Sequence, residues 1–229
     1  MQPYFFPYIG YFQLMQVVDT FVFFDDVQYI DRGWVNRNQI PVDGKPTWLT
    51  MPVRKASRSL PINRREYLLE EGVPALKRKL RAAYRVPQTA GTLAALEALL
   101  DFPDANVADF NVNLLCGIAS WLGINSRFIR ASGLMADDNG LRGEARIIEL
   151  CRRLAADHYV NPIGGTGLYN PARFTDSGIK LSFLRTTVAP SLTMGGAIHF
   201  SIVDLLLKLG IQSCRGVLPR YELLDGLAK

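Results

Sequence analysis

The chain has 229 residues, of which 48% are hydrophobic, which is enough to bury the core of a single domain over residues 1–229. A formal net charge of +5 favours a small-molecule anionic substrate, and nucleic acid is the weaker inference. No apolar run is long enough to cross a bilayer and no secretory leader is recognisable, which excludes a membrane partner and predicts a cytoplasmic protein. Three widely spaced cysteines predict reduced, buried thiols rather than disulfides or a zinc site.

The N-terminal third predicts a helix, a strand and a hairpin. Apolar spacing over residues 9–18 predicts a short helix that follows the turn at Pro7. The β-prone run at 20–25 predicts a strand buried on both faces. Extended runs at 34–40 and 47–53 flank Asp43-Gly44, a pair typical of two-residue hairpin turns. Residues 54–65 carry five basic residues with little periodicity, which predicts an exposed loop, either closing over an anion or simply solvated.

The rest of the chain alternates between helical and strand patterns. Helices are predicted at 73–85, 92–102 and 107–123, and then at 141–157, 170–178 and 201–210. Ser201 is a cap candidate for the last helix, with Asp204 in the place of the glutamate of a capping box. Strands are predicted at 126–132, 158–162 and 179–185. This order implies an α/β fold with an open, mostly parallel, Rossmann-like sheet, an inserted β-hairpin and a helical middle segment.

Polar side chains gather after the predicted strand at 20–25. Because ligands bind beyond the carboxyl ends of strands in open parallel sheets, this stretch is the first candidate site. It contains Asp25, Asp26, Gln28, Arg32, Asn36, Arg37 and Asn38. Either aspartate can act as a general base toward an amine or hydroxyl, or bind a metal, and the arginines can hold a phosphate or carboxylate. The alternative is that the aspartates end the strand and pair structurally with the arginines.

The opening segment, QPYFFPYIGYF at residues 2–12, places an aromatic cluster beside a helix start, where unpaired N–H groups favour an anion. Its layout is similar to the opening of nucleotidylyltransferases, so a nucleotidyltransferase-like version of the fold is one form of the prediction. Ile9 and Tyr11 stand where those enzymes have their two histidines, which argues against nucleotidyl transfer by that mechanism. The alternative reading is an aromatic plug of the core.

Two later features can contribute to a site. Gly164, Gly165 and Gly167 follow the predicted strand at 158–162, and they form either a ligand loop or a plain tight connection. His199 lies just before the last helix, from which it can act as acid or base. His158 opens an apolar strand, and we expect it to be structural. The sequence indicates no metal site, cofactor or oligomeric state.

Five segments together resemble the WbqC-like family of bacterial polysaccharide-cluster proteins: MQPYFFPYIGYFQL, DTFVFFDDVQY, RGWVNRN, YVNPIGGTGLYNPARF and HFSIVDLLLKLG. The resemblance implies a site made by Gln2, Pro3, Tyr4, Pro7, Gly10, Tyr11, Asp25, Asp26, Gln28, Arg32, Trp34, Asn36, Arg37 and Asn38, with Asn161, Gly164, Gly165 and Tyr169 opposite. It also implies a first strand before Gln2, so we expect either a mis-assigned start at Met1 or a sheet without that strand.

The residues and the resemblance together favour a group transferase of bacterial surface-polysaccharide (O-antigen) biosynthesis. Its substrate would be a nucleotide-linked or phosphorylated amino sugar, with aminoacyl or glycyl transfer as one form of the reaction. The first alternative is a non-catalytic nucleotide- or sugar-binding protein with a degenerate nucleotidyltransferase-like fold. The second is an RNA binder, suggested by the positive charge and the basic loop at 54–65.

Overall fold

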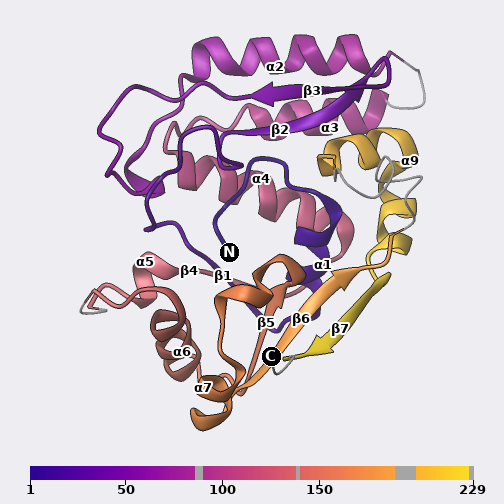
Figure 1. Cartoon of the computed structure of the whole chain (residues 1–229). Coiled ribbons are helices and arrows are strands. Elements are labelled where there is room, and N and C mark those ends of the chain that lie inside the picture. Colours follow the sequence, from indigo (N-terminus) through magenta and orange to yellow (C-terminus); the bar gives the residue numbers. More distant parts are fainter. Residues whose placement is uncertain (86–89, 138–139, 189–199, 227–229) are drawn as a thin grey trace.

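The computed structural model describes residues 1–85, 90–137, 140–188 and 200–226, which form a mixed α/β fold with small, partly parallel sheets (Figure 1). The elements of the first half are α1 (Ile9–Val17), β1 (Thr20–Phe23), β2 (Arg37–Val42), β3 (Lys45–Thr50), η1 (Ile62–Arg64), α2 (Leu69–Ala83), α3 (Ala90–Leu100) and α4 (Val107–Leu122). Those of the second half are β4 (Arg127–Arg130), α5 (Ala131–Leu134), α6 (Gly143–Arg153), β5 (His158–Pro162), η3 (Ile163–Leu168), α7 (Pro171–Asp176), β6 (Lys180–Thr186), α9 (Ile202–Val217) and β7 (Tyr221–Asp225).

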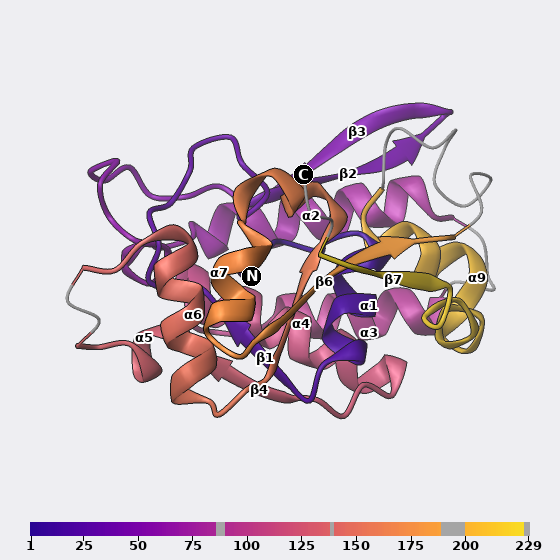
Figure 2. The same ribbon diagram turned by 60° about the horizontal axis from the view of Figure 1, so that its bottom comes forward.

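The predicted hairpin is confirmed. β2 and β3 pair in antiparallel register from Arg37↔Thr50 to Val42↔Lys45. Asp43 and Gly44 both have positive φ, at 49° and 73°, as a type I′ turn requires. In Figure 1 the hairpin lies beside α2 at the top of the molecule, away from the sheet of β5, β6 and β7, and Figure 2 shows it from a second side.

The helical middle segment is also confirmed, because α2, α3 and α4 follow one another between β3 and β4. The Asn106 side chain caps α4 by accepting from the N–H groups of Ala108 and Asp109, and Gly123 ends the helix in the left-handed conformation. Phe110, Leu114 and other residues of α4 pack in the larger of two hydrophobic clusters, which α1, β1 and α9 also join. The smaller cluster lies around α6, α7 and β6.

The thiols agree in part with the prediction. Cys151 and Cys214 are buried and unpaired, and burial raises their pKa values to about 11 and about 12, so both stay protonated at neutral pH. Cys116 is also unpaired, but it is only partly buried on α4.

Parallel pairing occurs, although the parallel pairs belong to different sheets. β1 pairs with β4 in parallel, and β5 pairs in parallel with β6. β7 was not predicted, and it adds an antiparallel edge to β6. The prediction that β1 is buried on both faces was wrong. Its residues alternate between buried and half-buried, because Phe21 and Phe23 enter the larger core while Val22 borders a cavity.

That cavity, of about 300 Å³, separates β1 from β5 and is lined by residues of both strands. The Met1 amino group donates to the Val22 carbonyl at 2.8 Å, and the Met1 carbonyl accepts from the Phe24 N–H at 2.7 Å, which is the pattern of a parallel ladder. Burial lowers the pKa of the Met1 amino group to about 5. Met1 thus pairs with β1 as one residue of a strand would, and the cavity lies next to it.

The last helix begins at Ser201 as predicted, since the Ser201 hydroxyl accepts from the Val203 N–H at 3.2 Å. The capping-box role of Asp204 was wrong. Its carboxylate accepts from the Tyr84 hydroxyl at 2.7 Å and from the Lys208 ammonium at 3.0 Å, so it joins α9 to the end of α2. No helix in the described part of the chain has both the length and the apolar character needed to cross a membrane.

Candidate functional site

Asp25 follows the carboxyl end of β1 and holds the segment that follows β4. Its Oδ1 accepts from the Ser132 N–H at 3.0 Å, and its Oδ2 accepts from the Ser132 hydroxyl at 2.6 Å. The Asp25 carbonyl accepts from the Asn63 N–H at 2.8 Å. Asp25 is buried, and both carboxylate oxygens are occupied. This geometry suits a residue that positions α5 more than one that takes a proton from a substrate.

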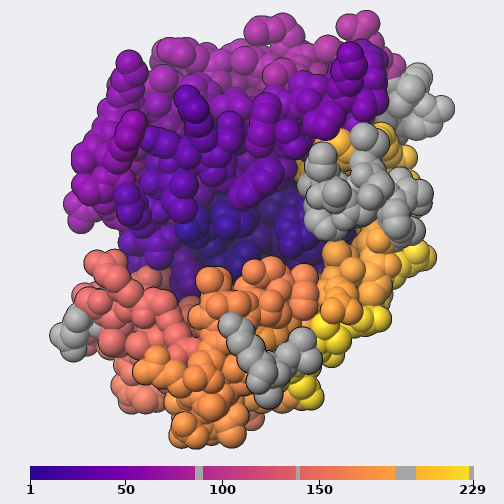
Figure 3. All heavy atoms as spheres, in the orientation of Figure 1, coloured from indigo at the N-terminus to yellow at the C-terminus, as the bar shows by residue number. Residues whose placement is uncertain are grey.

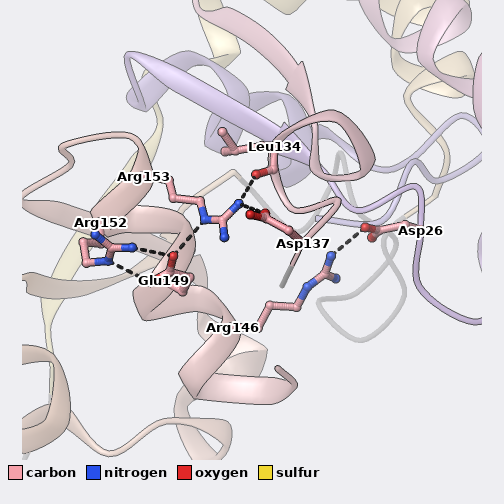
Figure 4. Close-up of polar contacts among 7 residues, drawn as sticks. All are labelled: Asp26, Leu134, Asp137, Arg146, Glu149, Arg152 and Arg153. Carbon is pink, nitrogen blue, oxygen red and sulfur yellow. Dashed lines mark hydrogen bonds and ion pairs between the residues drawn. The ribbon is translucent and has the colours of Figure 1, made fainter. Parts of the chain in front are cut away.

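Asp26 points the other way, into a second cavity. Its Oδ2 lies 2.6 Å from Nη2 of Arg146 on α6, and the two side chains face each other in Figure 4. The Arg146 guanidinium also lies over the Phe24 ring, 5.7 Å from its centroid. Asp26 Oδ1 is buried and has no hydrogen-bond partner among the described residues. A buried carboxylate oxygen of this kind can accept from a ligand.

We call this cavity the Asp26 pocket; its volume is about 520 Å³. It lies beyond the carboxyl ends of β1 and β4, where ligands bind in α/β proteins. Arg153 of α6 binds Glu149, Asp137 and the Leu134 carbonyl, which ties α6 to the segment that follows β4 (Figure 4). Its lining residues are Asp26, Val27, Gln28, Ser132, Met135, Ala136, Gly140, Leu141, Arg142, Gly143 and Arg146.

A larger cavity, of about 990 Å³, opens on the other side of Gln28, and we call it the Arg65 pocket. The basic loop at 54–65 forms one wall, which is held to the strand-end segment by the Tyr29 N–H donating to the Leu60 carbonyl and by the Gln28 amide donating to the Arg58 carbonyl. The lining residues are Gln28, Tyr29, Ile30, Asp31, Arg32, Asn36, Val53, Lys55, Ala56, Arg58 and Arg65. Gln28 lines both pockets.

Arg65 is the most unusual residue of this pocket, because its side chain is a buried cation. The residue is 5% exposed, whereas the whole loop was predicted to be exposed. The prediction was wrong for Arg65 because its neighbours Ile62 and Tyr67 are anchored in the core. Its guanidinium donates to the Ser57 carbonyl at 2.9 Å and to the Arg54 carbonyl at 3.4 Å. Nε has no partner, and no carboxylate in the described part of the chain pairs with this cation.

Two neutral groups face the same pocket. Asn36 donates from Nδ2 to the Met51 carbonyl at 3.0 Å, while its Oδ1 is buried without a partner among the described residues. The Tyr29 ring lies under the Arg65 guanidinium at 4.7 Å. Burial, with a smaller contribution from Asp31, raises the Tyr29 pKa to about 12, so its hydroxyl keeps its proton at neutral pH. The pocket therefore offers hydrogen-bond donors and acceptors next to an unpaired positive charge.

A comparison with known proteins supports the resemblance seen in the sequence. The model of the WbqC-like protein family matches residues 2–215. The chain belongs to the WbqC-like protein family. Its similarity extends to "Uncharacterized protein Rv1507c" of Mycobacterium tuberculosis (strain ATCC 25618 / H37Rv), with 29% identity over 217 residues that cover 90% of this chain and 91% of that protein. No solved structure gives a significant match.

The strand-end residues of this WbqC-like chain divide between the two pockets and the core. Gln28, Arg32 and Asn36, three of the predicted site residues, come together at the Arg65 pocket. Arg37 is not among the lining residues; its guanidinium lies 4.1 Å from the Trp48 ring centroid and donates to the Arg32 carbonyl. Asn38 is buried and donates to the Phe6 carbonyl at 2.8 Å, which gives it a structural role.

The opening motif of the WbqC-like chain is largely core. Figure 3 shows this segment as the indigo floor of a hollow between purple residues above and orange residues below. The buried Tyr11 hydroxyl donates to the Gln2 carbonyl at 2.8 Å, and the half-buried Tyr4 ring packs 5.9 Å from the Tyr11 ring. The Pro7 carbonyl accepts from the Ile202 N–H at 2.8 Å, and Gly10 is packed against the Tyr8 ring. None of residues 2–12 lines the Arg65 or Asp26 pocket.

The glycine-rich segment also lies apart from both pockets. Residues 163–168 form the short helix η3, and Asn161 borders the cavity between β1 and β5. The Asn161 Oδ1 accepts from the Tyr159 hydroxyl at 3.1 Å, and the Tyr169 hydroxyl lies 3.3 Å from that hydroxyl. Gly165 packs on Asn161, whereas a Cβ at Gly164 would meet nothing within 4 Å. His199 lies outside the described residues.

Several site residues carried no recognisable sequence signal. Arg146 and Arg142 belong to a stretch that reads only as an amphipathic helix and its start, and Arg65 looks like one more charge in a basic loop. Arg146 lies near the start of α6. Its pairing with Asp26 could have been predicted only if the packing of α6 beyond β1 had been known. The described residues contain no group of three or more His, Cys, Asp or Glu side chains placed to hold a metal ion.

Proposed function

We propose that this WbqC-like protein is a group transferase of bacterial surface-polysaccharide biosynthesis. Its substrate is a nucleotide-linked or phosphorylated amino sugar, and aminoacyl or glycyl transfer is one form of the reaction. The observation that carries the proposal is the buried guanidinium of Arg65, which faces a large pocket with an unpartnered Nε. Burying a cation is costly unless an anion compensates it, so a phosphate of the substrate is the natural partner.

The surroundings of Arg65 support an anionic ligand. Arg32, Lys55 and Arg58 add positive charge to the lining, and Asp31 is the acidic residue among the lining side chains. Asp31 already pairs with Arg58, whose Nε lies 3.5 Å from Oδ2, and both side chains are well exposed. The positive charge of the pocket therefore stays in excess. Asn36 Oδ1 and the Tyr29 hydroxyl are placed to bind hydroxyl or amine groups of a sugar.

The Asp26 pocket is the proposed place of the acceptor. It shares the Gln28 wall with the Arg65 pocket, so a group held in one cavity lies beside the other. The amine or hydroxyl attacks the transferred group, the bond from that group to its carrier breaks, and the carrier leaves with the electron pair. Asp26 Oδ1 accepts the proton of the attacking amine or hydroxyl, and Arg146 holds the carboxylate in place. We also propose that the parallel pairs β1·β4 and β5·β6 belong to an open, Rossmann-like arrangement of nucleotidyltransferase-like type; Asp25 and Asp26 at a strand end support this.

Calorimetric titration with sugar 1-phosphates and nucleotide sugars tests the anion site. The Arg65→Gln variant should bind them about tenfold or more weakly, since a hydrogen bond to a charged group is lost. Arg185→Gln is the matched control and should leave the affinity unchanged. Arg185 is exposed on β6, and its ion pair with Glu222 is long, at 3.8 Å. Equal affinities for wild type and Arg65→Gln, with both proteins folded, would overturn the proposal.

A non-catalytic ligand-binding protein is the second candidate. Two observations favour it: Ile9 and Tyr11, at the positions of nucleotidylyltransferase histidines, are buried, and both carboxylate oxygens of Asp25 are occupied. Mass spectrometry of a panel of donors with amine and hydroxyl acceptors separates the two candidates. Ligand binding that depends on Arg65, without any product across the panel, would select the binding protein.

A further inference from the structure

The turn at residues 30–34 exposes apolar side chains beside the Arg65 pocket. Among the described residues, the large hydrophobic side chains that are strongly exposed are Ile30, Trp34, Leu168 and Leu223. Two of these four lie in this one turn, Ile30 at 57% exposed and Trp34 at 46%. Folding gains little from a tryptophan left in water, so the exposed ring is available for a ligand.

Trp34 is nevertheless held in place. Its ring packs against Trp48 of β3, with centroids 5.7 Å apart and planes tilted by 38°. Its carbonyl accepts from the Phe5 N–H at 2.9 Å, which ties the turn to the buried aromatic core. The Arg37 guanidinium over the Trp48 ring completes a supported aromatic surface. A ring held in this way can stack on a flat ligand without first losing much conformational freedom.

The turn that carries the aromatic surface also contributes to the lining of the Arg65 pocket. Ile30, Asp31 and Arg32 line the pocket, and Trp34 comes two residues later. The Gly33 N–H donates to the Ile30 carbonyl at 3.1 Å, and the Arg37 guanidinium donates to the Arg32 carbonyl, so the turn is closed on both sides. Trp34 itself is not among the lining residues, but the chain and these two contacts keep it next to Arg32, which is one of them.

We propose that Trp34, supported by Trp48 and Arg37, stacks the base of a nucleotide whose phosphates lie in the Arg65 pocket. This deepens the proposed function and rests on it, since it assigns the substrate to the nucleotide-linked class. A nucleotide sugar has a base, a ribose, a diphosphate and a sugar in that order. Its base lies on Trp34, its diphosphate lies beside Arg65, and its sugar extends past Gln28 toward the Asp26 pocket.

Calorimetric binding of nucleoside diphosphates, inorganic pyrophosphate and a sugar 1-phosphate tests the stacking site. Nucleoside diphosphates should bind the wild-type chain about five- to 150-fold more tightly than pyrophosphate, which is the range expected for one stacked base. Trp34→Leu, which keeps an apolar side chain but no ring, should remove this advantage and leave pyrophosphate affinity unchanged. Trp34→Phe should keep part of it. Arg65→Gln should weaken all three ligands.

The outcomes separate the two proposals. If nucleoside diphosphates bind no more tightly than pyrophosphate, or if Trp34→Leu weakens both equally, the stacking site is overturned while the anion site stands. If only the sugar 1-phosphate depends on Trp34, the ring binds a sugar and the assignment to a base is wrong. If no phosphorylated ligand binds the folded chain, both proposals fail. Quenching of the combined Trp34 and Trp48 fluorescence in a Trp121→Phe background gives an independent reading of the same ratio.

Discussion

Asp26 and Arg146 are 120 positions apart in the sequence, yet Oδ2 of one lies 2.6 Å from Nη2 of the other. The contact joins the end of β1 to α6 and closes one side of the Asp26 pocket. Asp25, the preceding residue, is instead bound through both oxygens to Ser132. Two adjacent aspartates therefore have different environments, and the first two predictions separate their roles.

Replacement of Asp26 by asparagine should lower the transfer rate about 100-fold or more, because an amide cannot accept the acceptor's proton. Affinity for pyrophosphate in the Arg65 pocket should stay within about twofold, since the two cavities bind different parts of the substrates. Asp137→Asn is the control and should leave the rate unchanged. Asp137 pairs with Arg153, which lies on α6 as Arg146 does, but the Asp137 side chain is exposed. An unchanged product yield with Asp26→Asn would remove Asp26 from the reaction.

Replacement of Asp25 by alanine should act on stability. It leaves the Ser132 N–H and hydroxyl without their acceptor in a largely buried position, which should lower the free energy of unfolding by about 1–3 kcal/mol. Urea denaturation of Asp25→Ala, Ser132→Ala and the double variant measures the coupling between the two residues. Full stability together with complete loss of transfer would show that Asp25 is a catalytic residue after all.

Gly165 and Gly164 form a matched pair. A Cβ on Gly165 would lie 1.8 Å from Asn161 Nδ2, so alanine there must displace a buried side chain and its hydrogen bond from Tyr159. We expect Gly165→Ala to cost about 1–3 kcal/mol. Gly164→Ala meets no atom within 4 Å and should change stability by less than about 0.5 kcal/mol. Thermal unfolding of both variants checks this, and equal melting temperatures would contradict the packing of Gly165 on Asn161.

The Met1 amino group makes stability depend on pH. Its pKa is about 5 in the folded chain against a usual value of 8.0, so between pH 8 and pH 5 the unfolded state binds a proton that the folded state does not. Stability should therefore fall as the pH decreases across this window, by about 4 kcal/mol at most. Denaturant titrations of the 229-residue chain, with and without N-terminal acetylation, isolate this contribution. Parallel pH profiles for the two forms would show that the amino group is not buried.

Local signals predicted most of the elements, because their residues determine their own conformation. Asp43-Gly44 specified a hairpin through the positive φ of both residues, and the apolar spacing over residues 107–123 specified α4. β7 was missed because its side chains are mostly exposed or half-buried and do not form a run typical of a buried strand. The register of β7 on β6 depends on contacts between distant segments, and local sequence patterns do not predict those contacts.

The division of the candidate site was less predictable. Gln28, Arg32 and Asn36 lie within nine consecutive positions, and the structure places all three on the lining of one pocket. The sequence could not show that Arg65 is buried, since this depends on Ile62 and Tyr67 entering the core on either side of it. Nor could it show that Asn161 and Tyr169 bond mainly with Tyr159, apart from both pockets. Long-range packing decides each of these positions.

The cavity lies between an edge of β1 and an edge of β5. Within the described residues, Met1 pairs with the β1 edge and borders this cavity. Unpaired edges invite extended peptide from any source, including another molecule of the same chain. We expect the 229-residue chain to self-associate at high concentration through this opening. An extended peptide added in trans should occupy these edges and suppress the association, which analytical ultracentrifugation would measure.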